Sequence, residues 1–186
     1  MILQVNKMYD PTIGGVETVV KQYAKFLSQF EEVVVLCIND KFSFRTKYET
    51  IDGIRVVRCA SFGIFLSMPI SFVFFWKLFL LSRESSCIHF HEPFPLGSIG
   101  SLLIDKRKKI FVTWHSDIIR QKYLRRGAEF FQKILCQKSF GIISTSDRLT
   151  RFSSVLSLYK EKVTTIPLGF DDKSFAIEGV CEIVQD

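Results

Sequence analysis

Apolar runs of strand length alternate with amphipathic segments along the chain. Seven runs predict β-strands, at 2–5, 32–38, 54–58, 87–90, 109–114, 140–145 and 162–166. Five segments between them predict helices, at 16–30, 67–82, 95–104, 122–137 and 147–158. The run 33–38 is continuously apolar, which is typical of a parallel strand covered on both faces. The pattern therefore predicts an α/β fold: a doubly wound, mostly parallel sheet of about seven strands with helices on both faces.

Two segments are harder to interpret. The polar stretch 39–52 predicts a loop or a hairpin that ends at the turn Asp52-Gly53. The stretch 59–76 carries no charge, and its 18 residues approach the length of a membrane span. Because Gly63 and Pro69 lower its hydropathy and a crossover helix is needed there, a buried or interfacial helix is favoured over a span.

Composition narrows the class of protein. The chain has 186 residues, of which 47% are hydrophobic and 24% charged, so it is long enough for one domain with a substantial core and is neither disordered nor fibrous. Its net charge of +6 favours an anionic partner. Five widely spaced cysteines without a CxxC pair predict buried free thiols in a reducing cytosol. No secretory signal is expected, because the first residues lack a charged segment followed by an apolar one.

All three histidines fall at the ends of predicted strands, where ligands bind on doubly wound sheets. His89 lies inside its strand and is interpreted as a core histidine. His91 is as compatible with a core role as with a functional one. His115 directly follows a strand and is favoured as a functional residue. No thiolate or paired carboxylate accompanies His89 and His91, so no metal site is expected.

The first predicted strand is followed by Gly14-Gly15 at the start of a helix. A helix that begins with glycines leaves its first amides open to a phosphate or carboxylate, although a simple turn gives the same sequence. Glu17 is either a partner of the helix dipole or a side chain in the cleft. The basic clusters 106–109 and 120–126 fit a solvated surface or adhesion to anionic lipid, and no fold motif supports nucleic-acid binding.

Six short segments together resemble a known family. The chain is similar to the N-terminal, acceptor-side half of a family 4 (group 1) glycosyltransferase of the GT-B fold. The resemblance covers residues 1 to about 175 and rests on Gly14-Gly15-Val16-Glu17, Asp52-Gly53-Ile54-Arg55-Val56, Ile88-His89-Phe90-His91-Glu92-Pro93, Thr113-Trp114-His115-Ser116-Asp117, Ser144-Thr145-Ser146 and Ile166-Pro167-Leu168-Gly169-Phe170-Asp171.

The resemblance implies a domain division and a set of site residues. Residues 1–171 would form a Rossmann-like acceptor-binding domain, and 172–186 would begin an interdomain linker. His115 would be catalytic and contact the donor sugar beside the reacting carbon. The implied substrate-binding residues are Gly14, Gly15, Glu17, His91, Asp117 and Ser146. Neither a metal nor a cofactor is implied, because the nucleotide-sugar is a co-substrate held mainly by a second, C-terminal domain.

The resemblance also implies an activity: retaining transfer of a hexosyl group from a nucleotide-sugar to a saccharide or lipid-linked saccharide of a cell-envelope polysaccharide. This chain has no E-x7-E motif and no second Rossmann unit, so it is expected to lack turnover alone, as a truncated polypeptide, a truncated gene product or one chain of a split enzyme. The Phe-rich segment 62–81 and the basic clusters predict a cytoplasmic protein with peripheral contact at the inner face of the membrane.

Two alternatives remain open from the sequence. The chain could be a non-catalytic Rossmann-like subunit that docks to a partner chain. It could also be another doubly wound protein, a nucleotide-binding or flavodoxin-like domain, in which Asn39-Asp40 after the second strand would be the candidate ribose ligand.

Overall fold

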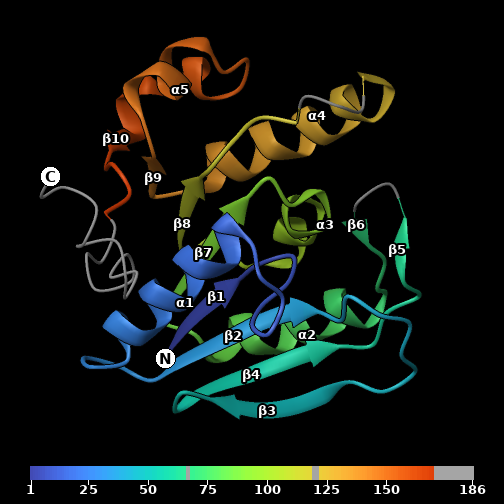
Figure 1. The fold of residues 1–186 in the computed structure, drawn as a ribbon. Helices are drawn as coiled ribbons and strands as arrows, with labels where there is room; N and C mark the ends of the chain where they lie inside the picture. Colours follow the sequence, from blue (N-terminus) through green and yellow to red (C-terminus); the bar gives the residue numbers. More distant parts are fainter. Residues whose placement is uncertain (66–67, 119–121, 170–186) are drawn as a thin grey trace, which may run out of the picture.

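The computed structural model describes residues 1–65, 68–118 and 122–169, which form a sheet covered by helices (Figure 1). The sheet has eight strands in the order β10-β9-β8-β7-β1-β2-β4-β3. Every neighbouring pair is parallel except β3 and β4. The strands are β1 (Ile2–Val5), β2 (Val33–Ile38), β3 (Lys47–Ile51), β4 (Ile54–Cys59), β7 (Cys87–Glu92), β8 (Lys109–Trp114), β9 (Gly141–Ser144) and β10 (Val163–Thr165). The predicted doubly wound, mostly parallel sheet is confirmed, with one strand more than the seven expected.

Helices cover both faces of the sheet, which separates two apolar cores. The helices are α1 (Gly15–Leu27), α2 (Val73–Glu84), α3 (Pro95–Gly100), α4 (Lys122–Lys138) and α5 (Asp147–Phe152), with 3-10 turns η1 (Ser101–Leu103), η2 (Leu156–Leu158) and η3 (Lys160–Lys162). On one face, Val20 and Ala24 of α1 pack against Val35 of β2. On the other, α2, α3 and α4 cover β7 and its neighbours.

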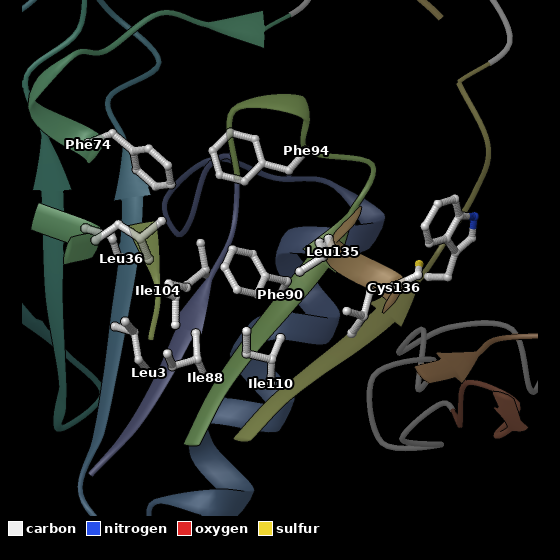
Figure 2. Packing of buried hydrophobic residues seen from close by; sticks show 14 of the residues in the cluster. Leu3, Leu36, Phe74, Ile88, Phe90, Phe94, Ile104, Ile110, Leu135 and Cys136 are labelled. Carbon is white, nitrogen blue, oxygen red and sulfur yellow. The ribbon is translucent and has the colours of Figure 1, made fainter. Parts of the chain in front are cut away.

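The larger core is built around aromatic side chains (Figure 2). Phe74 of α2 and Phe94, just before α3, meet edge to face with their ring centroids 5.2 Å apart. Beneath them Phe90 of β7 packs with the same cluster, and all three rings are fully buried. Full burial of a side chain of this size contributes about 2 kcal/mol each, so this cluster fixes α2 and α3 on the sheet.

The extra strand comes from the polar segment 39–52. β3 pairs antiparallel with β4, and the hairpin closes at Asp52 (φ 50°) and Gly53 (φ 79°). Both residues take the left-handed conformation that a two-residue hairpin turn requires, and Asp-Gly is a favoured pair for it. Of the two predictions for this segment, the hairpin is therefore correct.

The predicted helix 67–82 is wrong at its start. Its first part belongs instead to a small hairpin of β5 (Ile64–Phe65) and β6 (Met68–Pro69), and α2 begins only at Val73. Ser71 sets this boundary, because its Oγ accepts a hydrogen bond from the amide of Phe74 at 3.1 Å and so caps the helix. Among the described residues, none of the helices has the length and apolarity needed to cross a bilayer.

Three further boundaries differ from expectation. β7 extends to Glu92, so His91 lies within the strand rather than after it. The predicted helix 95–104 ends at Gly100 and continues as η1, and the predicted helix 147–158 ends at Phe152. The predicted linker 172–186 lies outside the described residues, as does Cys181. The four cysteines that are described are free thiols, and three of them are buried.

Candidate active site

The strand order reverses at β1, which lies between β2 and β7, and the predicted site residues gather at the carboxyl ends of these central strands. β1 leads to α1, β7 contains His91, and β8 leads to His115. A cavity of about 460 Å³ lies there, which we call the central cavity. It is lined by Gly15, Val16, Thr18, Val19, Gln22, His115, Ser116, Leu168 and Gly169. The structure thus brings Gly15 and His115 to one cavity, whereas Gly14 is not among its lining residues.

A second cavity of about 400 Å³, the α5 cavity, adjoins the first. His115 and Ser116 line both cavities, so the imidazole lies between them. Asp117 and Ser146 line the α5 cavity, together with the exposed Arg148. Sequence reasoning missed Arg148, because an arginine in a short surface helix carries no signal of its own.

The start of α1 is open toward the central cavity. Gly14 is extended (φ −173°) and no side chain caps the helix. A methyl group at Gly15 would meet no atom within 4 Å, so the first turn faces open space. The first amides of a helix have no partner within it, and the dipole makes this end positive. Anion binding at this helix end remains a prediction.

Glu17 lies against this loop rather than in the central cavity. Its residue is 8% exposed, and its carboxylate folds back over Gly14, with Oε2 2.2 Å from where a Cβ on Gly14 would be. Glu17 does not line either cavity. A direct role of Glu17 in binding remains a prediction.

His115 is half-buried and held from two sides. Its backbone amide donates to the carbonyl of Glu92 at 2.9 Å, and its Nε2 lies 3.1 Å from Nδ1 of His91. Burial lowers the pKa of His115 to about 4, so the imidazole is neutral at pH 7. A neutral imidazole offers one donor and one acceptor to its surroundings and carries no charge.

His91 is 1% exposed and lies behind His115 in the sheet. Its Nε2 is 2.7 Å from Oε1 of Gln4 on β1. Burial, with smaller effects from His89 and His115, holds the pKa of His91 well below its ordinary value. His89 is buried as well, bonded to Thr113 at 2.7 Å, as expected of a core histidine. Gln4 was not singled out from the sequence, although a glutamine in the apolar strand Ile2–Val5 is a signal.

Asp117 and Ser146 have structural partners. Oδ1 of Asp117 accepts hydrogen bonds from Nε1 of Trp114 at 2.9 Å and from Oγ of Ser153 at 2.8 Å. Ser146 caps α5 by accepting from the amide of Leu149 at 3.2 Å. Both residues shape the wall of the α5 cavity, and binding of substrate by either remains a prediction.

Metal ligands do not converge in the part of the chain that the structure describes: no group of three His, Cys, Asp or Glu side chains is placed to hold an ion. His91 and His115 direct their facing nitrogens at one another rather than at a shared point. The described residues of the central cavity offer hydrogen bonds, a helix terminus and a neutral imidazole, and the α5 cavity adds the cationic Arg148.

Comparison with known proteins places this chain in a family. The model of Glycosyltransferase Family 4 matches residues 13–174. The chain is 26% identical over 175 residues to the O-antigen chain mannosyltransferase C of Escherichia coli, covering 91% of this chain and 46% of that protein. It is 26% identical over 178 residues to D-rhamnosyltransferase WbpZ of Pseudomonas aeruginosa, covering 94% and 46%. The chain thus spans about half the length of these curated relatives.

Solved structures agree on the fold. Sucrose-phosphate synthase from Thermosynechococcus elongatus superposes with a TM-score of 0.65 at 15% identity, covering 92% of this chain and 49% of that one. An α,α-trehalose-phosphate synthase (UDP-forming) from Burkholderia vietnamiensis gives a TM-score of 0.55 at 11% identity, covering 94% and 49%. The sheet therefore resembles one half of a GT-B glycosyltransferase. Since the family model extends over most of the residues, the chain belongs to glycosyltransferase family 4.

Proposed function

We propose that this chain is the acceptor-side half of a retaining glycosyltransferase that moves a hexosyl or deoxyhexosyl group from a nucleotide-sugar to a saccharide or lipid-linked saccharide of a cell-envelope polysaccharide. One observation carries the proposal: His115 and the open start of α1 line the same cavity at the carboxyl edge of the sheet. The names of the mannosyl- and rhamnosyltransferase relatives support the class of sugar and of product.

The two features have complementary tasks in such a reaction. As the sugar leaves the nucleotide, negative charge grows on the diphosphate, and the first amides of α1 offer N–H donors to it. His115, neutral at pH 7, hydrogen-bonds a hydroxyl of the sugar and orients it toward the acceptor. The acceptor enters between these groups.

A donor-binding domain completes the proposed enzyme. None of the described residues that line the central cavity is a lysine or an arginine. A departing diphosphate needs more stabilisation than one helix end supplies, since each such terminus contributes about 0.3–1 kcal/mol and at most about 2. We therefore expect the 186-residue chain to show no turnover alone.

Joining the chain to the donor half of its mannosyltransferase relative tests the activity. The fusion is incubated with GDP-, UDP- and dTDP-sugars and a polyprenyl-diphosphate-linked saccharide, and the anomeric configuration of the product is read by NMR. We expect transfer with retained configuration, and a loss of about 100-fold in kcat for His115→Ala. Turnover by the unfused chain would contradict the division of labour. Full activity of His115→Ala would show that His115 is structural.

An exposed aromatic surface supports a lipid-linked acceptor. It lies around the β5–β6 hairpin and the start of α2, at the edge of the sheet that also holds the central cavity (Figure 1). Backbone hydrogen bonds between Ser43 and Ser61 join its two segments, and the rings of Phe62 and Phe72 pack 5.8 Å apart. The members are Phe42, Phe44, Phe62, Phe65, Phe72 and Trp76, each more than half exposed. Exposed aromatic patches of this kind bind partners or membranes.

The charges around this surface refine the proposal. Lys41 and Lys47 are exposed in the segment that carries Phe42 and Phe44, and they can meet anionic headgroups. The cluster 106–109, in contrast, precedes β8 and so lies at the opposite edge of the sheet. Lys41 and Lys47, with the exposed Arg45 between them, can face the same bilayer as these rings.

Vesicle sedimentation tests this contact. We expect the chain to pellet with phosphatidylcholine vesicles that contain phosphatidylglycerol more than with phosphatidylcholine alone. Replacing two of these exposed rings, with Phe65→Ser and Phe72→Ser, removes apolar area that would enter the bilayer and should weaken binding about tenfold or more. Phe30→Ser is the matched control, because Phe30 is 73% exposed after α1, at the other edge of the sheet. Equal recovery in the supernatant with both kinds of vesicle would refute membrane contact.

A further inference from the structure

A chain of buried polar side chains crosses the sheet beneath α1 and ends at His115. Gln4 on β1, His91 on β7 and His115 after β8 come from three adjacent strands. Oε1 of Gln4 lies 2.7 Å from Nε2 of His91, and Nδ1 of His91 lies 3.1 Å from Nε2 of His115. This hydrogen-bonded series of three side chains thus spans the point where the strand order reverses.

The number of protons on the two imidazoles determines which atom donates and which accepts in each hydrogen bond between Gln4, His91 and His115. A neutral imidazole has one N–H donor and one acceptor nitrogen, and burial keeps both rings neutral. The carbonyl of Gln4 can only accept, so His91 donates from Nε2 and has a bare Nδ1. That nitrogen accepts, so His115 donates from Nε2. The remaining nitrogen of His115, Nδ1, then has an unshared electron pair.

The surroundings contain no competing partner for these nitrogens among the described residues. The nearest ring, His89, has its centroid 4.4 Å from that of His91, but its Nε2 is bonded to Thr113. Tyr23 of α1 packs against the His91 ring at a centroid distance of 5.9 Å and shields it. The carboxylate of Glu92 points to other partners, Ser98 and Gln132.

Gln4 itself carries a cost that needs an explanation. Its Nε2 is a buried donor for which the described part of the chain provides no hydrogen-bond acceptor. An unpaired buried donor costs about 1–3 kcal/mol, and an apolar residue in this otherwise apolar strand would avoid that cost. The bond from its carbonyl to His91 is what an apolar residue would not supply.

We propose that Gln4 and His91 are positioning residues that hold His115 with its proton on Nε2 and its Nδ1 ready to accept a hydrogen bond from a ligand in the adjoining cavities. In the proposed function, on which this last step rests, the ligand group is a sugar hydroxyl. His115 would then serve as a hydrogen-bond acceptor toward the sugar, not as an acid.

Long-range proton–nitrogen NMR correlations on the 186-residue chain with labelled histidine test the proton positions directly. We expect Nε2 of both His91 and His115 to be protonated and Nδ1 of both to be bare. A proton on Nδ1 of His115 would overturn the proposal. It would mean that the oxygen and nitrogen of the Gln4 amide are exchanged, and that donor and acceptor are exchanged in both hydrogen bonds, Gln4–His91 and His91–His115.

Variants test the part played by Gln4. Gln4→Leu removes the acceptor, so the protected Nε2–H signals of His91 and His115 should be lost to rapid exchange. Gln4→Glu presents only acceptor oxygens and should retain them. Thr113→Val is the matched control, since it should alter the signals of His89 alone. Unchanged His115 signals in Gln4→Leu would overturn the role of Gln4. If Gln4→Leu does not fold, loss of the protected Nε2–H signals of His91 and His115 in Gln4→Glu would also overturn the role of Gln4.

The same variants in the active fusion separate this proposal from the proposed function. We expect Gln4→Leu to lower kcat about tenfold with little change in KM, and Gln4→Glu to restore it. If the proton positions are as expected but no glycosyl transfer occurs, the proposed function is refuted and the positioning role of Gln4 and His91 stands. If transfer occurs but Nδ1 of His115 carries a proton, the positioning role is refuted and the proposed function stands.

Discussion

At the residue scale, the three histidines make the folded state sensitive to acid. Burial lowers the pKa of His89 to about 3 and that of His115 to about 4, and it holds the pKa of His91 well below its ordinary value. The unfolded chain binds these protons near pH 6.5, whereas the folded chain does not. Their stabilising effect is therefore complete above about pH 6.5 and is lost as the pH falls toward 4.

Urea unfolding between pH 7 and pH 4 measures this effect. The free energy of unfolding should fall by up to about 1.4 kcal/mol per pH unit for each histidine. Glu92 acts in the opposite sense, because burial raises the pKa of its carboxyl and the folded state gains a proton first. In His115→Ala, the slope of the free energy of unfolding against pH should be smaller by the contribution of one proton, about 1.4 kcal/mol per pH unit. A free energy of unfolding that does not change over this pH range would contradict the buried, neutral state of the rings.

The histidines also show how far single residues can be predicted. The position of His115 at the carboxyl edge of the sheet was predictable because it directly follows a strand, and His89 was correctly interpreted as core. The relation between His91 and His115 could not be predicted, because it depends on the parallel register that sets His91 beside Thr113. Gln4 was missed for the same reason: its partner is 87 residues away in the sequence.

At the element scale, Gly15 in the first turn of α1 is a residue whose replacement should affect ligand binding without affecting stability. A methyl group on Gly15 meets no atom within 4 Å, yet Gly15 lines the central cavity. Gly15→Ala should therefore leave the free energy of unfolding unchanged or slightly raised, while a diphosphate can no longer approach the first amides closely.

Kinetics of the active fusion measure the effect of Gly15→Ala, for which we expect a rise of about tenfold in KM for the nucleotide-sugar. Gly127→Ala in α4 is the control, since a methyl group there also meets no atom and Gly127 lines neither cavity. It should stabilise the chain by up to about 1 kcal/mol without changing KM. An equal KM for Gly15→Ala and the unchanged protein would exclude anion binding at this helix end.

Arg58 of β4 ties the loop before α1 to the sheet. Its residue is 5% exposed, and its guanidinium donates to the carbonyl of Asp10 at 2.5 Å, to that of Tyr9 at 3.3 Å and to Glu49 at 3.0 Å. Arg58→Leu removes these bonds and should lower the free energy of unfolding by about 3 kcal/mol.

Chemical denaturation compares this change with Arg55→Leu on the same strand. Arg55 pairs with Glu32 at 3.3 Å and both side chains are about half exposed, so its loss should cost less than about 1 kcal/mol. Similar losses for the two variants would show that Arg58 does not anchor the loop.

Elements were predicted best where local pattern and tertiary environment agree. Most of the seven expected strands are apolar runs that the sheet buries, and each was found, including the edge strand Val163–Thr165, which has no fully buried residue. The region 59–76 was misread because it combines exposed rings around a hairpin, such as Phe62 and Phe65, with the buried Phe74 on α2, and periodicity does not reveal which side faces solvent. The cap at Ser71 was the available signal for the true start of α2.

At the scale of the whole molecule, the lining of the central cavity indicates which kind of substrate this chain suits. Its central cavity offers a helix end, a neutral imidazole and backbone, and none of its described lining residues is cationic. This set suits a neutral saccharide, which binds through hydrogen bonds, better than a nucleotide diphosphate, which brings two or more negative charges. The other half must therefore hold the donor in the proposed enzyme.

Titration calorimetry on the 186-residue chain measures how weakly it binds nucleotide-sugars. A helix end contributes at most about 2 kcal/mol to anion binding, while a dissociation constant of 1 mM requires about 4 kcal/mol. We therefore expect nucleotide-sugars to bind more weakly than about 1 mM, and the fusion with a donor half to bind them at least about tenfold more tightly. Gly15→Ala should make no measurable difference in the unfused chain, because the interaction it removes is already too weak to detect. Micromolar binding of a nucleotide-sugar by the chain alone would mean that this half holds the donor, and the two substrates would have to exchange places in the proposed site.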